Sequence, residues 1–187
     1  MKNNYSLYYS YKTLGDVLLV VFDNEKKTTR SETKGDVVVL YHEEEIIGYN
    51  IFHLRNIVKI KTSGLIYLPS PTLIEVVNNI LKNNNVEQLE MIKSSGYLIG
   101  EVKQINGEQT LINIGKDHVF IKTDNRLHIG DKVVIANIGT RLNNGQLVKD
   151  MAHLCNEKDL QISDSEEPLI LDKEDENGKD FFTTEER

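Results

Sequence analysis

The sequence after Lys93 is a succession of short apolar segments separated by tight turns, and this pattern constrains the fold more than any other feature. Strand-like segments occupy residues 96–105, 110–114, 118–122, 131–138, 145–148 and 169–171. The Asn106-Gly107 pair between the first two segments is a strong hairpin signal, and it predicts a type I′ turn. Short strands with turns at this spacing predict a small five-stranded β-barrel. An SH3-like barrel would give a similar pattern, so periodicity alone does not choose between barrel types.

The first half mixes strand-like segments with one helical segment. Apolar runs of strand length cover residues 15–22, 35–41, 46–52 and 57–60, with a shorter extended piece at 64–68. Ser70 or Thr72 can cap a helix in which Pro71 suits the first turn. Apolar residues then recur at helical spacing until the Asn83-Asn84-Asn85 run, at Leu73, Val76, Val77, Ile80 and Leu81. We expect residues 1–92 to form a small α+β domain.

Charge is distributed unevenly along the chain, whose formal net charge is -7. Residues 1–92 carry -1, residues 93–152 carry +2 and residues 153–187 carry -8. Nucleic-acid phosphates require Lys and Arg, so the mildly basic central segment permits RNA binding without demonstrating it. We expect an acidic, frayed tail at residues 172–187, after a barrel domain at residues 93–171.

Several classes of protein are disfavoured by the sequence. The longest apolar run, residues 17–22, is too short to cross a membrane, and the polar start has no signal core. The single cysteine, Cys155, fits a reducing compartment, so we expect a cytoplasmic protein in which Cys155 is packed as a small apolar residue. Phosphate loops, dinucleotide-binding glycines, nucleophile elbows and metal-ligand spacings are missing. We therefore expect no enzyme, no cofactor and no metal.

Segments in both halves of the chain together carry a family resemblance. In the first half they are Gly15-Asp16-Val17-Leu18-Leu19, Lys34-Gly35-Asp36-Val37-Val38 and Gly48-Tyr49-Asn50-Ile51-Phe52. In the second half they are Tyr97-Leu98-Ile99-Gly100-Glu101-Val102, Gln109-Thr110-Leu111, Asp131-Lys132-Val133-Val134-Ile135-Ala136 and residues 155–160. In order and spacing they resemble the bacterial YtpR family, in which a small α+β domain precedes an EMAP-II-like OB domain that binds tRNA. The resemblance implies an α+β chain with an OB-fold, five-stranded barrel at residues 93–171, and binding of tRNA or other structured RNA without catalysis.

The loops that face RNA in that family are altered here. The loop between the first two strands is reduced to Asn106-Gly107-Glu108. The Gly-Ala-Pro-Asn element survives only as Lys122-Thr123-Asp124-Asn125, and Leu142-Asn143-Asn144 stands where the family has Met-Pro. The Arg-Gly and Ser-x-Gly-Met stretch before the cysteine is missing. The resemblance therefore implies a retained scaffold with degenerate RNA-binding loops.

Two functions remain open at this point, and one geometric question separates them. If the chain binds RNA, the candidate residues are Tyr97 for base stacking, Asn125 for hydrogen bonding, and the cations Lys103, Lys122, Arg126, Lys132, Arg141 and Lys149. The alternative is a protein-interaction or dimerisation module, a homodimer for example, that has lost RNA binding; the net charge and the missing loops favour it. The geometric feature that separates the two hypotheses is whether Lys122, Arg126, Arg141 and Lys149 converge on one face.

Overall fold

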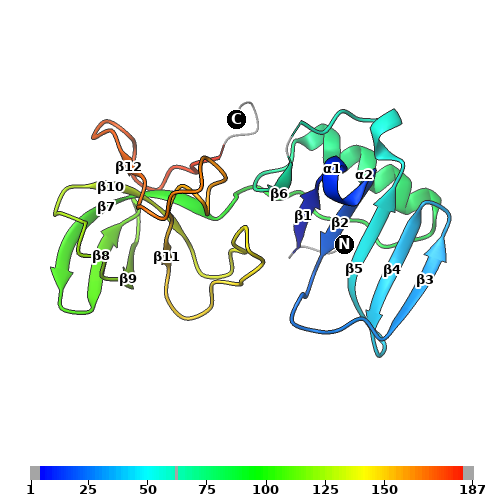
Figure 1. The fold of residues 1–187 in the computed structure, drawn as a ribbon, viewed down its shortest axis with the longest axis horizontal. Helices are drawn as coiled ribbons and strands as arrows, with labels where there is room; N and C mark the ends of the chain where they lie inside the picture. Colours follow the sequence, from blue (N-terminus) through cyan, green and yellow to red (C-terminus); the bar gives the residue numbers. More distant parts are fainter. Residues whose placement is uncertain (1–4, 62, 183–187) are drawn as a thin grey trace. The chain divides into compact units, whose positions relative to one another are not determined.

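The computed structural model describes residues 5–61 and 63–182, and the chain divides into two compact units between Lys93 and Ser94 (Figure 1). Strands dominate both units, and helices are few. The chain is therefore mainly β, and the expected α+β character is reduced to one long helix and two single-turn helices in the first unit.

The first unit contains one six-stranded antiparallel sheet with the strand order β3-β4-β5-β2-β1-β6. Its strands are β1 (Ser6–Tyr9), β2 (Val17–Val21), β3 (Arg30–Lys34), β4 (Val37–His42), β5 (Glu45–Phe52) and β6 (Gly64–Ile66). Its helices are α1 (Tyr11–Leu14), the 3-10 turn η1 (Leu54–Asn56) and α2 (Pro71–Asn83).

The helix expected after residue 70 is present as α2. The hydroxyl of Ser70 accepts a hydrogen bond from the Leu73 amide at 3.2 Å, and Pro71 occupies the first turn. Buried residues of one helix face join the core of the sheet, namely Leu73, Ile74, Val77 and Leu81. The amphipathic pattern of this segment thus packs the helix against the sheet.

Other local expectations in the first unit need correction. Residues 57–60 do not form a strand, because the amides of Ile57 and Val58 both donate to the Leu54 carbonyl in a turn that follows η1. The strands β1 and β3 were not expected from the sequence. All but the last residue of β3 are exposed, as suits an edge strand whose hydrogen bonds to β4 define it.

The second unit is a curled antiparallel sheet with the order β11-β10-β7-β8-β9, and β12 pairs with β10 (Figure 1). Its strands are β7 (Tyr97–Asn106), β8 (Gln109–Asn113), β9 (His118–Lys122), β10 (Lys132–Ala136), β11 (His153–Leu154) and β12 (Ile170–Leu171). The long strand β7 has a bulge between Val102 and Gln104. A parallel bridge between Ile121 and Ala152 brings the two ends of this sheet together.

One turn and one expected strand in the second unit differ from expectation. The two-residue loop between β7 and β8 consists of Gly107 and Glu108, and only Gly107 has a positive φ, of 55°. This is the pattern of a type II′ turn, in which only the first central residue needs a positive φ. Residues 145–148 form no strand and contribute only the isolated bridge between Arg141 and Leu147.

The expected frayed tail is ordered over residues 172–182. The Ile99 amide donates to the Lys179 carbonyl at 2.9 Å, and the Phe181 amide donates to the Tyr97 carbonyl at 2.8 Å. Phe181 is buried. This segment therefore adds main-chain pairing to the first half of β7, where β8 does not reach. The remaining tail positions, 183–187, lie outside the described residues.

Candidate nucleic-acid interface

The outer face of β8 and β9 is an exposed, mixed surface. Strand alternation directs Thr110, Ile112 and Ile121 inward, where they are buried. The opposite side carries three cross-strand pairs, namely Leu111 with Phe120, Gln109 with Lys122, and Asn113 with His118. Phe120 is 49% exposed at the centre of this face. An exposed aromatic ring between polar and cationic side chains is a suitable platform for an unpaired base.

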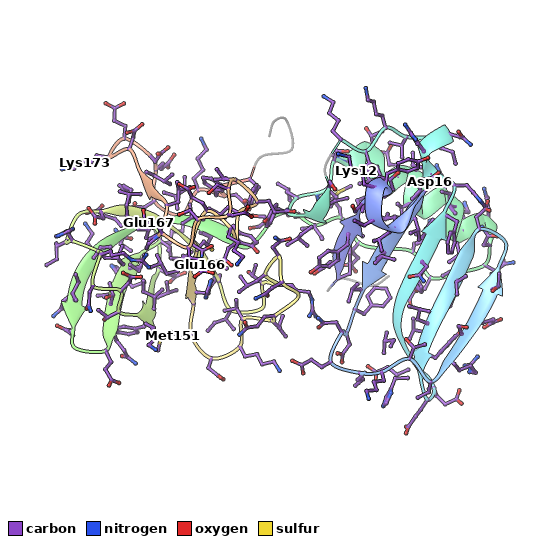
Figure 2. All side chains as sticks on the ribbon, viewed as in Figure 1. Lys12, Asp16, Met151, Glu166, Glu167 and Lys173 are labelled. Atoms are coloured by element: carbon purple, nitrogen blue, oxygen red, sulfur yellow. The ribbon has the colours of Figure 1, made fainter. Side chains whose placement is uncertain are left out.

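A pocket of about 370 Å³ adjoins this face at the end of β9. It is lined by Lys122, Thr123, Asp124, Arg126, Ala152, His153, Leu154, Asn156, Glu166 and Pro168. The bridge between Ile121 and Ala152 explains why β9 and β11 both contribute to it. Figure 2 shows Glu166 close to β11. Because Lys122 belongs to both the pocket and the outer face, the two form one candidate site.

The charge of Arg126 is neutralised inside this pocket. Its Nε donates to Oδ1 of Asp124 at 2.9 Å, its Nη2 donates to Oδ2 at 2.6 Å, and its Nη1 donates to the Glu166 carbonyl at 3.3 Å. The hydrogen bond from Arg126 lowers the pKa of the Asp124 carboxyl. Such a two-pronged pair leaves Arg126 little freedom to bind a phosphate.

Three other predicted cations also have partners within the chain. Lys103 donates to Glu101 at 2.5 Å, and Arg141 donates through Nη1 to the Gly145 carbonyl at 2.9 Å. Lys132 is only 8% exposed, and its ammonium donates to the Asp175 carbonyl and to Oδ1 of Asn177. Lys132 is therefore a structural residue that anchors the C-terminal segment.

Three further predicted residues are exposed, in addition to Lys103 and Arg126. Lys122 has no side-chain hydrogen bond or ion pair within the described residues. Asn125 and Lys149 are exposed as well, Asn125 in the loop after β9 and Lys149 in the long connection between β10 and β11. Of the four residues whose convergence was in question, the pocket brings together Lys122 and Arg126 but not Arg141 or Lys149.

Tyr97 cannot serve as the stacking residue in this structure. Its side chain is 1% exposed, and its hydroxyl donates to the Arg141 carbonyl at 3.0 Å. The ring of Phe182 packs against it edge-on, with 5.4 Å between the ring centroids. Since its ring has no free face, we leave Tyr97 out of the candidate site.

Sequence reasoning missed Phe120, His118 and His153. The first two could have been found from the alternation in His118-Val119-Phe120-Ile121-Lys122, which places an aromatic ring on the same side as the terminal lysine. His153 had no local signal, because the pocket forms only when β11 lies beside β9. Its Nε2 lies 2.9 Å from Oδ2 of Asp159.

Two features bear on other classes of function. No group of three or more His, Cys, Asp or Glu suited to a metal ion occurs among residues 5–61 and 63–182. No helix in that part of the chain is long and apolar enough to cross a membrane.

Comparison with known proteins adds family evidence. A family model described as "Domain of unknown function (DUF4479)" matches residues 23–91, within the first unit. The chain is also 28% identical over 197 residues to "Putative tRNA-binding protein YtpR" of Bacillus subtilis (strain 168), with 93% of this chain and 98% of that protein covered. The resemblance to the YtpR family is confirmed. The YtpR likeness extends over both units, whereas the family model matches the first unit alone. Neither comparison indicates a catalytic family.

Proposed function

We propose that this chain is a non-catalytic protein that binds tRNA or another structured RNA through the outer face of β8 and β9. The observation that carries the proposal is Phe120, which is 49% exposed beside Leu111 and two residues from Lys122, a cation without a partner among residues 5–61 and 63–182. A base stacked on Phe120 would bring its phosphate near the ammonium of Lys122. The printed name of the Bacillus subtilis relative supports tRNA as the first ligand to test.

The topology of the second unit supports an OB-type barrel over residues 93–171, preceded by a separate domain at residues 1–92. The OB fold is a five-stranded, partly open Greek-key barrel that binds oligonucleotides on its second and third strands. In this unit those positions belong to β8 and β9. The parallel bridge between Ile121 and Ala152 joins the third strand to the start of the fifth, which favours this barrel over an SH3-like one. We infer a cytoplasmic location, since tRNA is the proposed ligand.

Replacing Phe120 by Ala tests the proposal. Stacking contributes about 1–3 kcal/mol per base, so the variant should bind unfractionated tRNA at least about fivefold more weakly in fluorescence anisotropy at low salt. The melting temperature should change little, because half of the side chain is exposed. The matched control is Ile129→Ala, which removes another exposed apolar side chain of the same unit. Wild-type protein without measurable tRNA binding at low salt would refute the proposal.

A second candidate is a protein-interaction or dimerisation module. The ion pairs within the chain favour it, because Lys103, Arg126 and Lys132 are bound by groups of the protein itself. Light scattering after size exclusion distinguishes this candidate. A concentration-dependent dimer with no affinity for tRNA would support it over RNA binding.

A further inference from the structure

One stretch of the first unit is basic and free of acid. Residues 46–74 contain no Asp or Glu, but they include Arg55, Lys59 and Lys61. The unit as a whole is close to neutral, so its acidic residues lie elsewhere in the sequence. A local surplus of positive charge is the electrostatic feature that phosphate binding requires.

Asp16 holds the backbone of Arg55, the first cation of this stretch. Both of its carboxylate oxygens accept from the Arg55 amide at 3.1 Å, and Oδ1 also accepts from the Tyr9 hydroxyl at 3.1 Å. The Arg55 guanidinium then lies over the ring of Tyr11, 4.2 Å from its centroid. This cation–π contact holds the guanidinium plane against the short helix α1.

A second contact holds Ser63, which follows the last of these cations, to the N-cap residue of the same helix. The Ser63 hydroxyl donates to the Ser10 hydroxyl at 3.2 Å, directly before α1. Lys59 and Lys61 lie between the two contacts, and Lys12 belongs to α1 itself. Figure 2 shows Lys12 and Asp16 at the same end of this unit. The fold therefore brings together the two separate segments that carry these four cations.

These cations are available to a ligand. Lys12, Arg55, Lys59 and Lys61 are exposed, and none of the four has an ion pair within the described residues. Of the two nearby carboxylates, Asp16 is bound to the Arg55 amide and the Tyr9 hydroxyl, and Asp36 lies 2.8 Å from Nδ1 of His53. Tyr11 is 50% exposed. This differs from the second unit, where Lys103, Arg126 and Lys132 are bound internally.

We propose that Lys12, Arg55, Lys59 and Lys61 around Tyr11 form a second RNA-binding surface, which contacts the phosphate backbone. The proposal rests on the proposed function and assigns a role to the first unit. A guanidinium stacked on a ring still presents N–H donors in its plane to a phosphate, and exposed lysines add sequence-independent attraction. Exposed Leu14 and Ile57 near these cations would also suit an anionic membrane surface. RNA is favoured because α1 has only four residues, too few for a membrane-bound amphipathic helix.

The experiment compares two triple variants with equal loss of charge. The first variant removes three cations of the proposed surface by combining Lys12→Gln, Lys59→Gln and Lys61→Gln. The second variant removes three exposed lysines elsewhere in the same unit by combining Lys27→Gln, Lys82→Gln and Lys93→Gln. Affinity for unfractionated tRNA is measured by anisotropy at several salt concentrations. We expect the first triple variant to bind about tenfold more weakly than the second. The slope of log affinity against log salt concentration should also be smaller in magnitude by about two for the first variant. Each lost phosphate contact removes about 0.7–0.9 from this slope.

The outcomes separate this inference from the proposed function. Equal affinities and equal salt slopes for the two triple variants would overturn the second surface, while a weakened Phe120→Ala variant would leave the first surface standing. Wild-type protein that does not bind tRNA would overturn both. A parallel measurement tests membrane binding with vesicles of phosphatidylcholine and 30% phosphatidylserine, which have about the charge of an anionic leaflet. If the first triple variant loses binding to these vesicles, the second keeps it, and tRNA affinity is unchanged, RNA is not the ligand of this surface. Melting temperatures confirm that each variant is folded.

Discussion

The guanidinium of Arg126 is held by two hydrogen bonds to the carboxylate of Asp124, at 2.9 Å and 2.6 Å. The two residues are two positions apart in the loop after β9, and they line the same pocket as Lys122, whose ammonium has no partner among the described residues. This pair reduces the positive potential of the candidate site, although the sequence places two cations there. The proposed RNA affinity of the site therefore depends on an acidic residue that the protein itself supplies.

Replacing Asp124 by Asn should strengthen RNA binding. The change removes one negative charge and frees Arg126, which is worth about 1 kcal/mol at close range in water, or about fivefold in affinity. Anisotropy with unfractionated tRNA at low salt measures the effect. The control is Asp117→Asn, an exposed aspartate just before the other end of β9. Equal gains for both variants would mean that only net charge matters.

Replacing Gly107 by Val should destabilise the second unit by about 1–2 kcal/mol. Gly107 has a φ of 55° at the first central position of the β7–β8 turn, which a β-branched residue adopts only with strain. An added Cβ would meet no atom within 4 Å, so the backbone conformation alone is tested. Chemical denaturation measures the loss, and Gly107→Asn should cost less because Asn tolerates this region. Equal stability of the Val variant and the wild type would contradict the turn assignment.

Replacing Phe181 by Ala should destabilise the second unit by about 2–4 kcal/mol. The side chain is buried, and its ring packs edge-on against Phe182, 5.0 Å between centroids. Deleting residues 172–187 should therefore cost stability, rather than only remove negative charge. Replacing the exposed Asp172, Glu174 and Glu176 by their amides keeps the segment and should tighten tRNA binding modestly. If the Phe181→Ala variant had the same melting temperature as the wild type, the packing of residues 172–182 onto the second unit would be contradicted.

Asp159 should contribute stability that is lost in acid. Burial raises the pKa of its carboxyl, but hydrogen bonds from His153 and the Asn156 amide lower it by more, and the net shift is downward. A group with a lowered folded-state pKa stabilises the fold above its unfolded pKa, and that contribution disappears as the pH falls through the folded value. Asp159→Asn should cost about 1 kcal/mol at pH near 6 and almost nothing at a pH below the folded-state pKa of the carboxyl. Urea unfolding at both pH values measures this, with the exposed Asp164→Asn as control.

Elements with strong local signals were predicted well from the sequence. The Ser70 cap, Pro71 and the apolar spacing of α2 act within a few residues, so they need no tertiary context. The same holds for the hairpin of β7 and β8, although its turn type was wrong. Prediction failed for β3 and for residues 57–60. An exposed edge strand is defined by hydrogen bonds to β4, and a short apolar segment can equally become a turn packed on the sheet.

The sequence by itself determined which residues are charged, which strands alternate and where the helix begins. Only the tertiary structure decided which cations remain free, because pairing depends on segments far apart in the chain. Lys132 is bound by Asn177, 45 positions away, and Tyr97 is covered by Phe182 from the C-terminal segment. Arg55 lies over the ring of Tyr11, distant in sequence and next to Lys12 in the chain, and Asp16 holds the Arg55 backbone there. A side chain's availability to RNA follows from burial and neighbouring charge, and both are properties of the folded chain.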